Sequence, residues 1–149
     1  RNAIELAQVI GVREPKVAIL AAVETVSPTM TATLDAAALC KMADRGQITG
    51  GLLDGPLAFD NAVSIAAARI KGIVSEVAGQ ADILVVPDLE SGNMLAKQLI
   101  FMGGAASAGI VLGAKVPVIL TSRADSRDTR IASCAIALML AHHYRLSPP

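Results

Sequence analysis

Short apolar runs alternate with longer segments of helical periodicity, and this alternation constrains the fold of the 149-residue chain more than any other feature. Such runs suit strands buried on both faces of a parallel sheet, and the segments between them suit crossover helices. The pattern predicts an α/β fold with three layers, α/β/α, around a mostly parallel sheet. It predicts strands over Val17–Ala22, Ile48–Leu53, Ala81–Val86, Ile110–Leu112 and Val116–Leu120. It predicts helices over Asn2–Ile10, Ala32–Asp44, Asn61–Ile70, Met94–Met102 and Ser126–His143.

Composition and charge narrow the class of protein. Hydrophobic residues make up 53% of the chain and charged residues 17%, which is typical of a packed globule and not of a disordered segment. The 13 basic and 13 acidic residues give a formal net charge of zero without any basic block, so no nucleic-acid partner is expected. No apolar run approaches the roughly 20 residues that span a bilayer, so no membrane partner is expected either.

The cysteines and the first residue bear on the cellular compartment of the chain and on whether it is part of a longer polypeptide. Cys40 and Cys134 lie in alanine-rich helical patterns, where a small buried thiol is the ordinary explanation, and their spacing predicts no metal site. So few cysteines favour a reducing compartment, and the predicted localisation is cytoplasmic. The chain begins with Arg1 and carries no secretory leader pattern, so we expect it to be a piece of a longer polypeptide.

Three polar loops follow predicted strands, at the edge where open α/β sheets bind ligands. The richest of them, residues 121–126, places Ser122, Arg123 and Asp125 between a buried strand and a helix. A helix N-terminus offers unpaired N–H donors, and an adjacent arginine can bind a phosphate through two hydrogen bonds, so this loop suits an anion. Alternatively, Asp125 or Ser126 caps the helix and the charged side chains are solvated, which on spacing alone is the more common reason for such residues.

The other two loops offer weaker candidates. In the loop that follows Val86, Gly92 would permit close backbone approach and Asn93 could bond a ligand, with Lys97 one helical turn later. An ordinary strand-to-helix turn with an exposed lysine explains the same residues. The loop Asp54-Gly55-Pro56 suits either a ligand contact or a simple tight turn.

Three segments together carry a resemblance to a known family. They are LDGPLAFDNA (residues 53–62), ADILVVPDLESGN (residues 81–93) and VPVILTSRADS (residues 116–126). In order and spacing they resemble the phosphate acetyl/butyryl transferase family over nearly the whole chain, most closely the branch fused behind an enoyl-CoA hydratase domain. The resemblance implies reversible transfer of an acetyl or butyryl group between coenzyme A and inorganic phosphate, with acyl-CoA, acyl phosphate and phosphate as partners. Coenzyme A would be a substrate, and no tightly bound cofactor is implied.

The resemblance also implies an architecture. Members of this family are similar in fold to isocitrate and isopropylmalate dehydrogenases, with two domains, a cleft between them and a homodimer. On this basis residues 1–115 are expected to form part of the second domain, and residues 116–149 a C-terminal segment of the first. Basic residues that the family uses for phosphate and coenzyme A would then lie upstream of Arg1, so the isolated chain is expected to have little or no activity.

Site residues follow from the same resemblance. Arg123 matches the Ser-Arg motif of the family and would hold phosphate, while Ser122 would hydrogen-bond the reacting carbonyl. The acetyltransferase branch has a carboxylate seven residues after that serine to assist the thiol, but Thr129 occupies the position here. Asp128 and Asp125 are the available substitutes. Asp54, Gly55, Gly92, Asn93 and Lys97 are the expected substrate-binding residues.

Two other functions are compatible with the same sequence. A nicotinamide-dependent oxidoreductase would share the fold, but it needs a cofactor site and metal-binding aspartates that the sequence does not offer. A non-catalytic dimerisation module of a fused hydratase would explain an incomplete site.

Overall fold

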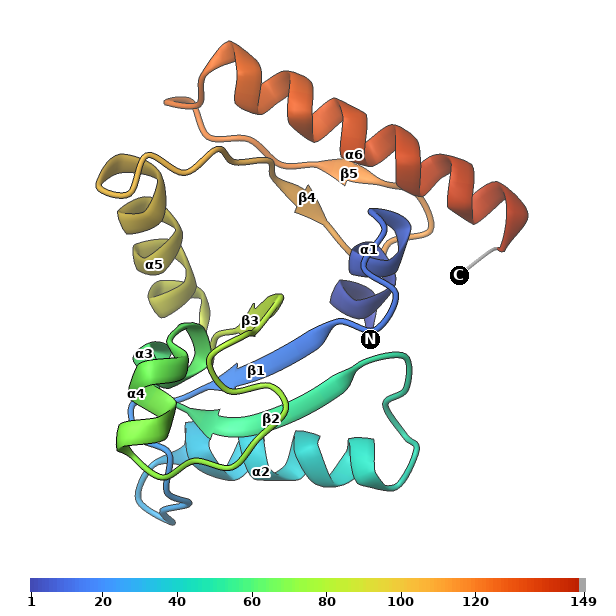
Figure 1. Ribbon diagram of the computed structural model, residues 1–149. Coiled ribbons are helices and arrows are strands. Elements are labelled where there is room, and N and C mark those ends of the chain that lie inside the picture. The colour runs from blue at the N-terminus through green and yellow to red at the C-terminus, as the bar shows by residue number, and fades with distance from the viewer. Residues whose placement is uncertain (148–149) are drawn as a thin grey trace.

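A computed structural model of the protein describes residues 1–147, so the last two residues of the segment expected at 116–149 lie outside the described part. The elements alternate as predicted (Figure 1). The strands are β1 (Lys16–Leu20), β2 (Leu52–Leu57), β3 (Ile83–Val85), β4 (Ile110–Val111) and β5 (Val118–Ile119). The helices are α1 (Asn2–Val9), α2 (Thr31–Asp44), α3 (Phe59–Val63), α4 (Ile65–Ile70), α5 (Leu89–Phe101) and α6 (Arg127–Leu146).

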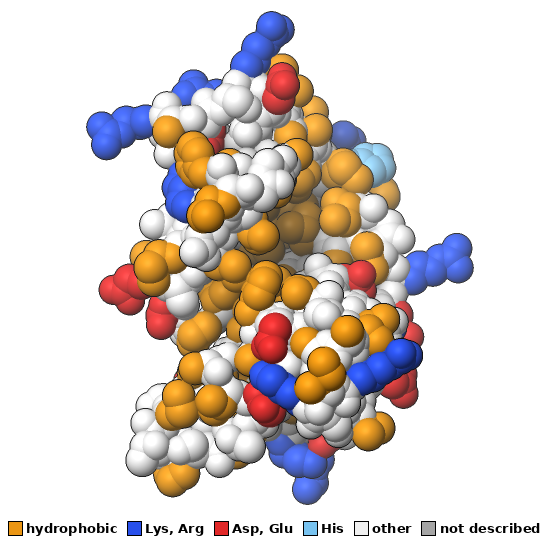
Figure 2. Space-filling model, turned by 60° about the vertical axis from the view of Figure 1, so that its left-hand side comes forward, with side chains coloured by type: hydrophobic (Ala, Val, Ile, Leu, Met, Phe, Trp, Pro, Cys, Tyr) orange, Lys and Arg blue, Asp and Glu red, His pale blue; other side chains and the backbone are white. Residues whose placement is uncertain are grey.

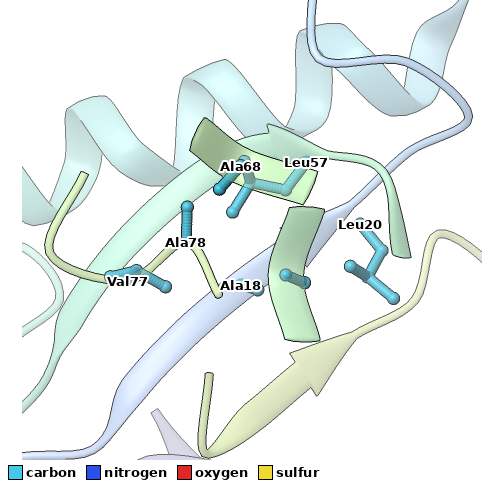
Figure 3. Packing of buried hydrophobic residues seen from close by; sticks show 7 residues of the cluster. Ala18, Leu20, Leu57, Ala68, Val77 and Ala78 are labelled. Carbon is cyan, nitrogen blue, oxygen red and sulfur yellow. The ribbon is translucent and has the colours of Figure 1, made fainter. Parts of the chain in front are cut away.

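A parallel sheet of order β2-β1-β3 forms the centre of the fold. Side chains of β1 alternate between its two faces, as they must in a strand. Ala18 and Leu20 join a hydrophobic cluster with residues of α3, α4 and the segment after them, and Figure 3 shows this packing. Val17 and Ile19 join a second cluster with residues of α1 and α2. The sheet is therefore covered by helices on both faces, which confirms the predicted α/β class and its layers.

The predicted turn at residues 54–56 is wrong, because β2 continues through it to Leu57. Gly55 lies so close to β1 that a Cβ atom there would stand 2.7 Å from the carbonyl oxygen of Ile19. Pro56 is tolerated because β2 is an edge strand of its sheet, where a missing N–H costs little. The register between β1 and β2 shifts at this point, between Ala18 and Leu20.

The largest differences from the predicted helices occur at two places. The helix expected over residues 61–70 is broken at Ser64, whose hydroxyl accepts a hydrogen bond from the Ala67 N–H and caps α4. The helix α5 begins at Leu89, five residues before the predicted Met94. Its start is explained by Asp88, whose carboxylate accepts a hydrogen bond from the Ser91 N–H at 2.7 Å.

Beyond the parallel sheet, β4 and β5 pair antiparallel and α6 packs along them, near the top of Figure 1. Several of the most apolar side chains of α6 do not lie on its buried face. Ile131 is 55% exposed and Leu138 is 71% exposed, while Ser133 is fully buried. A small residue at 133 allows close approach to β4, where the Ser133 hydroxyl accepts a hydrogen bond from the Gly109 N–H at 2.9 Å.

The end of α6 returns to the start of the chain. His143 Nε2 lies 3.2 Å from Glu5 Oε1 on α1, so the last helix and the first are in contact. None of the helices within residues 1–147 combines the length and the apolar character that a membrane crossing requires.

Candidate active site

The loop between β5 and α6 is held in one conformation by its own side chains. Asp125 Oδ2 accepts a hydrogen bond from the Ser122 N–H at 2.5 Å, and the Asp125 N–H donates to the Ser122 carbonyl at 3.1 Å. The Ser122 hydroxyl oxygen accepts from the Ala124 N–H at 3.3 Å. Ser126 caps α6 by accepting from the Thr129 N–H. Both the predicted cap and the predicted polar turn are therefore present, and Asp125 is the residue that closes the turn.

This turn faces α5 across a pocket of about 440 Å³. Four of the predicted site residues line it, although they come from segments about 30 residues apart: Asn93, Lys97, Ser122 and Asp125. The Lys97 Nζ atom lies 5.6 Å from the centroid of the Phe101 ring. This cation–π contact keeps the ammonium group close to the surface of α5. The pocket thus combines an ammonium group, an amide, a hydroxyl and a carboxylate, which suits a small anionic substrate.

Arg123 and Asp128 are both exposed, and neither is among the residues that line this pocket, although Arg123 follows Ser122 directly in the chain. Asp128 lines a neighbouring hollow of about 560 Å³ that shares Asp125 and Thr129 with the first. Thr129 lies between the two, and its hydroxyl is 3.2 Å from that of Ser107. Position 129 therefore presents a hydroxyl, and the two nearby carboxylates, those of Asp125 and Asp128, both precede it in the sequence.

The structure places the other predicted substrate-binding residues elsewhere. Asp54 lines a separate hollow of about 340 Å³ with Asp44 and Glu76. Burial, followed by the charges of Asp54 and Asp44, raises the pKa of the neighbouring Cys40 thiol to about 11. Gly55 lies in β2 and packs against β1, so its lack of a side chain has a structural reason.

Gly92 and Asn93 lie inside α5 and not in a loop, because α5 begins early. A Cβ atom at Gly92 would stand 2.8 Å from Val86 Cγ2, so this glycine lets the helix pack against the end of the preceding strand. Asn93 points the other way along the helix surface, into the pocket that contains Ser122.

Sequence reasoning missed Ser107, which lines the pocket and bonds to Thr129. The only signal in the sequence was a run of small residues, Ala105 to Gly109, which permits close approach but does not predict a ligand contact. Gly109, in the same run, also has to be small. A Cβ atom there would collide with the carbonyl oxygen of Leu120, the residue that follows β5.

Hydrophobic side chains line a hollow in the middle of one face of the molecule (Figure 2).

Within residues 1–147, no group of three or more His, Cys, Asp or Glu side chains is arranged to hold a metal ion.

Comparison with known proteins identifies the family. Residues 1–138 match the family "Phosphate acetyl/butaryl transferase". The chain is 66% identical over 145 residues to a phosphate acetyltransferase of Rhizobium meliloti, covering 97% of this chain and 46% of that protein. It is 49% identical over 140 residues to a phosphate butyryltransferase of Clostridium acetobutylicum, covering 94% of this chain and 46% of that protein.

A search of solved structures finds a protein of the same kind as these relatives. The crystal structure of a branched-chain phosphotransacylase from Enterococcus faecalis V583 superposes with a TM-score of 0.83 at 38% identity, covering 95% of this chain and 50% of that one. The chain thus spans about half the length of the proteins it matches. With a family match over residues 1–138 and a shared fold, this chain belongs to the phosphate acetyl/butyryl transferase family.

Proposed function

We propose that the natural full-length protein transfers an acetyl or butyryl group reversibly between coenzyme A and inorganic phosphate. The single observation that carries the proposal is the pocket that joins Ser122, which Arg123 follows in the chain, with Asn93 and Lys97. Two of the three segments that resemble the family contribute Asn93 and Ser122 to it. Membership of the family and the activities named for its relatives support the same reaction.

The chemistry we propose is direct attack of the coenzyme A thiol on the carbonyl carbon of the acyl phosphate. A carbon–sulfur bond forms, the bond from that carbon to the phosphate oxygen breaks, and phosphate leaves. Arg123 would bind the phosphate, and Ser122 would donate a hydrogen bond to the carbonyl oxygen as negative charge develops there. Holding both substrates together supplies much of the rate enhancement in such a transfer.

The thiol proton needs an acceptor, and two carboxylates are available. The carboxylate of Asp125 already accepts the Ser122 N–H, so moving it would open the turn that carries the serine. Asp128 is exposed at the first turn of α6, and no hydrogen bond to its carboxylate is found within the described residues. We therefore propose Asp128 as the base and Asp125 as a positioning residue.

The wider architecture is proposed from the family alone. It comprises a cytoplasmic homodimer, a fold similar to isocitrate and isopropylmalate dehydrogenases, and a division between residues 1–115 and 116–149. The pairing of β4 with β5 would then join the two parts. Fusion to an enoyl-CoA hydratase domain stays a prediction. The names of the relatives give no support to an oxidoreductase or to a non-catalytic module, and we propose neither.

The test is formation of acyl-CoA from acetyl phosphate and from butyryl phosphate by the natural full-length protein, its Arg123→Ala variant and the isolated 149-residue chain. Loss of the phosphate contact is expected to lower kcat/KM by about 10²–10³-fold, the range seen when one charge-stabilising donor is removed. Arg69→Ala, which removes an exposed arginine from α4, is the matched control. Turnover by the isolated chain would contradict the expectation that its site is incomplete. Absence of transfer with both acyl phosphates would contradict the proposed function itself.

A further inference from the structure

Three hydroxyl groups form a chain at the first turn of α6, and the proposed reaction does not use them. The Ser126 hydroxyl oxygen lies 3.1 Å from that of Thr129, which lies 3.2 Å from that of Ser107. Ser107 and Thr129 line the pocket that contains Ser122, whereas Ser126 lines the neighbouring hollow of about 560 Å³. The chain therefore begins outside the pocket and ends at its wall.

The two ends of this chain differ in their backbone contacts. Within residues 1–147, Ser126 is the only one of the three whose hydroxyl accepts a backbone hydrogen bond, from the Thr129 N–H at 3.1 Å. A hydroxyl that accepts a hydrogen bond becomes a stronger donor through its own proton, and the N-terminus of a helix adds a partial positive charge. The favoured direction of donation is therefore from Ser126 to Thr129 and from Thr129 to Ser107.

This direction leaves the proton of the Ser107 hydroxyl available to a ligand. A serine hydroxyl donates one hydrogen bond and has two acceptor lone pairs. Among the described residues, the Thr129 hydroxyl is the one hydrogen-bond partner of the Ser107 side chain. Once Ser107 accepts from Thr129, its own O–H is a polarised donor at the wall of the pocket.

The charges around the two hollows indicate which of them receives an anion. The neighbouring hollow has the carboxylates of Asp125 and Asp128 as its charged lining groups. The pocket that contains Ser122 has Lys97 and Asp125, and the Asp125 carboxylate already accepts the Ser122 N–H. Lys97 forms none of the ion pairs found within residues 1–147. A negatively charged ligand is therefore favoured on the Lys97 side, in the pocket that Ser107 also lines.

We propose that the Ser107 hydroxyl donates a hydrogen bond to a phosphoryl oxygen of the acyl phosphate, and that Thr129 is a positioning residue that orients this donor. The inference rests on the proposed acyl transfer and adds a substrate contact to its site. It also explains the hydroxyl at position 129. An ionised carboxylate there would only accept hydrogen bonds, whereas the threonine hydroxyl both accepts from Ser126 and donates to Ser107.

The experiment measures phosphate binding and acyl transfer separately in the natural full-length protein. For Ser107→Ala, we expect the Kd for inorganic phosphate, from a phosphorus NMR titration, and the KM for acetyl phosphate to rise at least about tenfold, as for a lost hydrogen bond to a charged group. The kcat should change less than about twofold, because the contact is made in both the ground state and the transition state. Thr129→Val keeps the shape of the side chain and should raise both quantities about threefold, and Thr129→Ser should restore them.

The double variant Ser107→Ala with Thr129→Val tests whether Thr129 acts through Ser107. If it does, the double variant binds phosphate as weakly as Ser107→Ala alone and no more weakly. Losses that multiply would contradict the positioning role of Thr129, because they would mean that the two hydroxyls act independently.

Ser133→Ala is the matched control. The buried Ser133 hydroxyl joins the same segment to α6 through the Gly109 N–H, but it does not line the pocket. The melting temperature of this variant is expected to fall while its Kd for phosphate stays unchanged. Equal losses of phosphate affinity in Ser133→Ala and Ser107→Ala would overturn the inference, since they would indicate a general loosening of the segment.

Three other outcomes bear on the proposal. An unchanged Kd and KM in Ser107→Ala would overturn it, and so would a fall in kcat alone, which would place the hydroxyl at the reacting carbonyl. Absence of phosphate binding by the unaltered protein would overturn it as well. If the unaltered protein binds phosphate but transfers no acyl group, the proposed function fails, and the Kd values for phosphate alone then decide this inference.

Discussion

The sheet region (residues 1–86) and the outer region (residues 87–147) differ in how completely they are packed. The sheet region supplies every member of the two hydrophobic clusters, apart from Leu95 at the margin of one. In the outer region, α5 has no buried residue, and only Ala137 and Leu140 are buried hydrophobics. Yet the pocket that contains Ser122 is lined entirely by the outer region. The site is therefore carried by the less packed part of the molecule.

This difference has a physical meaning. A surface with many exposed apolar side chains gains stability when another protein surface covers it. The outer region exposes Met102, Leu120 and Leu138, whereas the sheet region buries its strands between helices. The chain spans about half the length of the family members it matches, which is consistent with an outer region that is packed in the longer proteins.

The largest expected effect is the loss of stability when a leucine is replaced by alanine. If the loss were the same in both regions, the comparison would be wrong. Leu57→Ala removes a side chain that is 2% exposed in the sheet region, and should lower the free energy of unfolding of this chain by about 2–5 kcal/mol. Leu138→Ala removes the same atoms from a site that is 71% exposed, and should change the free energy of unfolding by less than about 0.5 kcal/mol. Both are measured by denaturant unfolding at equilibrium. Similar losses would mean that Leu138 is covered and that the comparison is wrong.

The reactivity of the two cysteines tests the difference in packing, because Cys40 lies in the sheet region and Cys134 in the outer region. Burial, followed by the charges of Asp54 and Asp44, raises the pKa of the Cys40 thiol from 9.0 to about 11, which lowers its thiolate fraction near pH 8 by about a hundredfold. Cys134 in the outer region is exposed. Alkylation followed by mass spectrometry should therefore label Cys134 well before Cys40. The single variants Cys40→Ser and Cys134→Ser assign each rate, and faster labelling of Cys40 would contradict the expected burial of that thiol.

The smallest expected effect concerns the start of α5 in acid. Hydrogen bonds from the Ser91 N–H and then from its hydroxyl hold the pKa of Asp88 below its usual value of 3.8. A lowered pKa means that this cap stabilises the helix above pH 3.8 and is lost as the pH falls through the pKa in the folded state. Amide exchange in α5, corrected for its intrinsic pH dependence, should therefore accelerate in acid before that of β1.

Asp88→Asn keeps a capping acceptor but does not titrate, so it provides the control for that experiment. In this variant the acid-dependent part of the exchange should disappear. If the α5 amides of the variant and of the unaltered chain respond identically to pH, the cap does not control the stability of this helix.

Much of the fold was predictable because the spacing of apolar residues indicates the type of secondary structure. Four of the five strands and the helices α1, α2, α5 and α6 exist where apolar spacing indicated them, with shifted ends, while β2 lies four residues later in the chain than the predicted strand. The predicted helix boundaries were wrong where a single capping hydrogen bond determined the observed boundary. Asp88 extends α5 backwards by capping it, and Ser64 divides one predicted helix in two. Neither residue is distinguished in the sequence from many other serines and aspartates.

The candidate site was predictable only in part. Ser122 and Asp125 follow from one loop and Asn93 and Lys97 from another segment, but that the two meet in one pocket depends on how α5 and the β4–β5 pair are placed. Ser107 carried no signal of its own, and its role beside Thr129 comes from the packing of a small-residue segment against α6.

The sequence by itself determined the α/β alternation and the polar turn before α6, because both depend on residues that are near one another along the chain. Only the tertiary structure decided which face of α6 is buried. Ile131 and Leu138 are the more apolar choice, yet the helix buries Ser133, Ala137 and Leu140 instead. Small side chains let the helix approach β4 closely enough for Ser133 to bond to Gly109, and that contact depends on residues 24 positions apart.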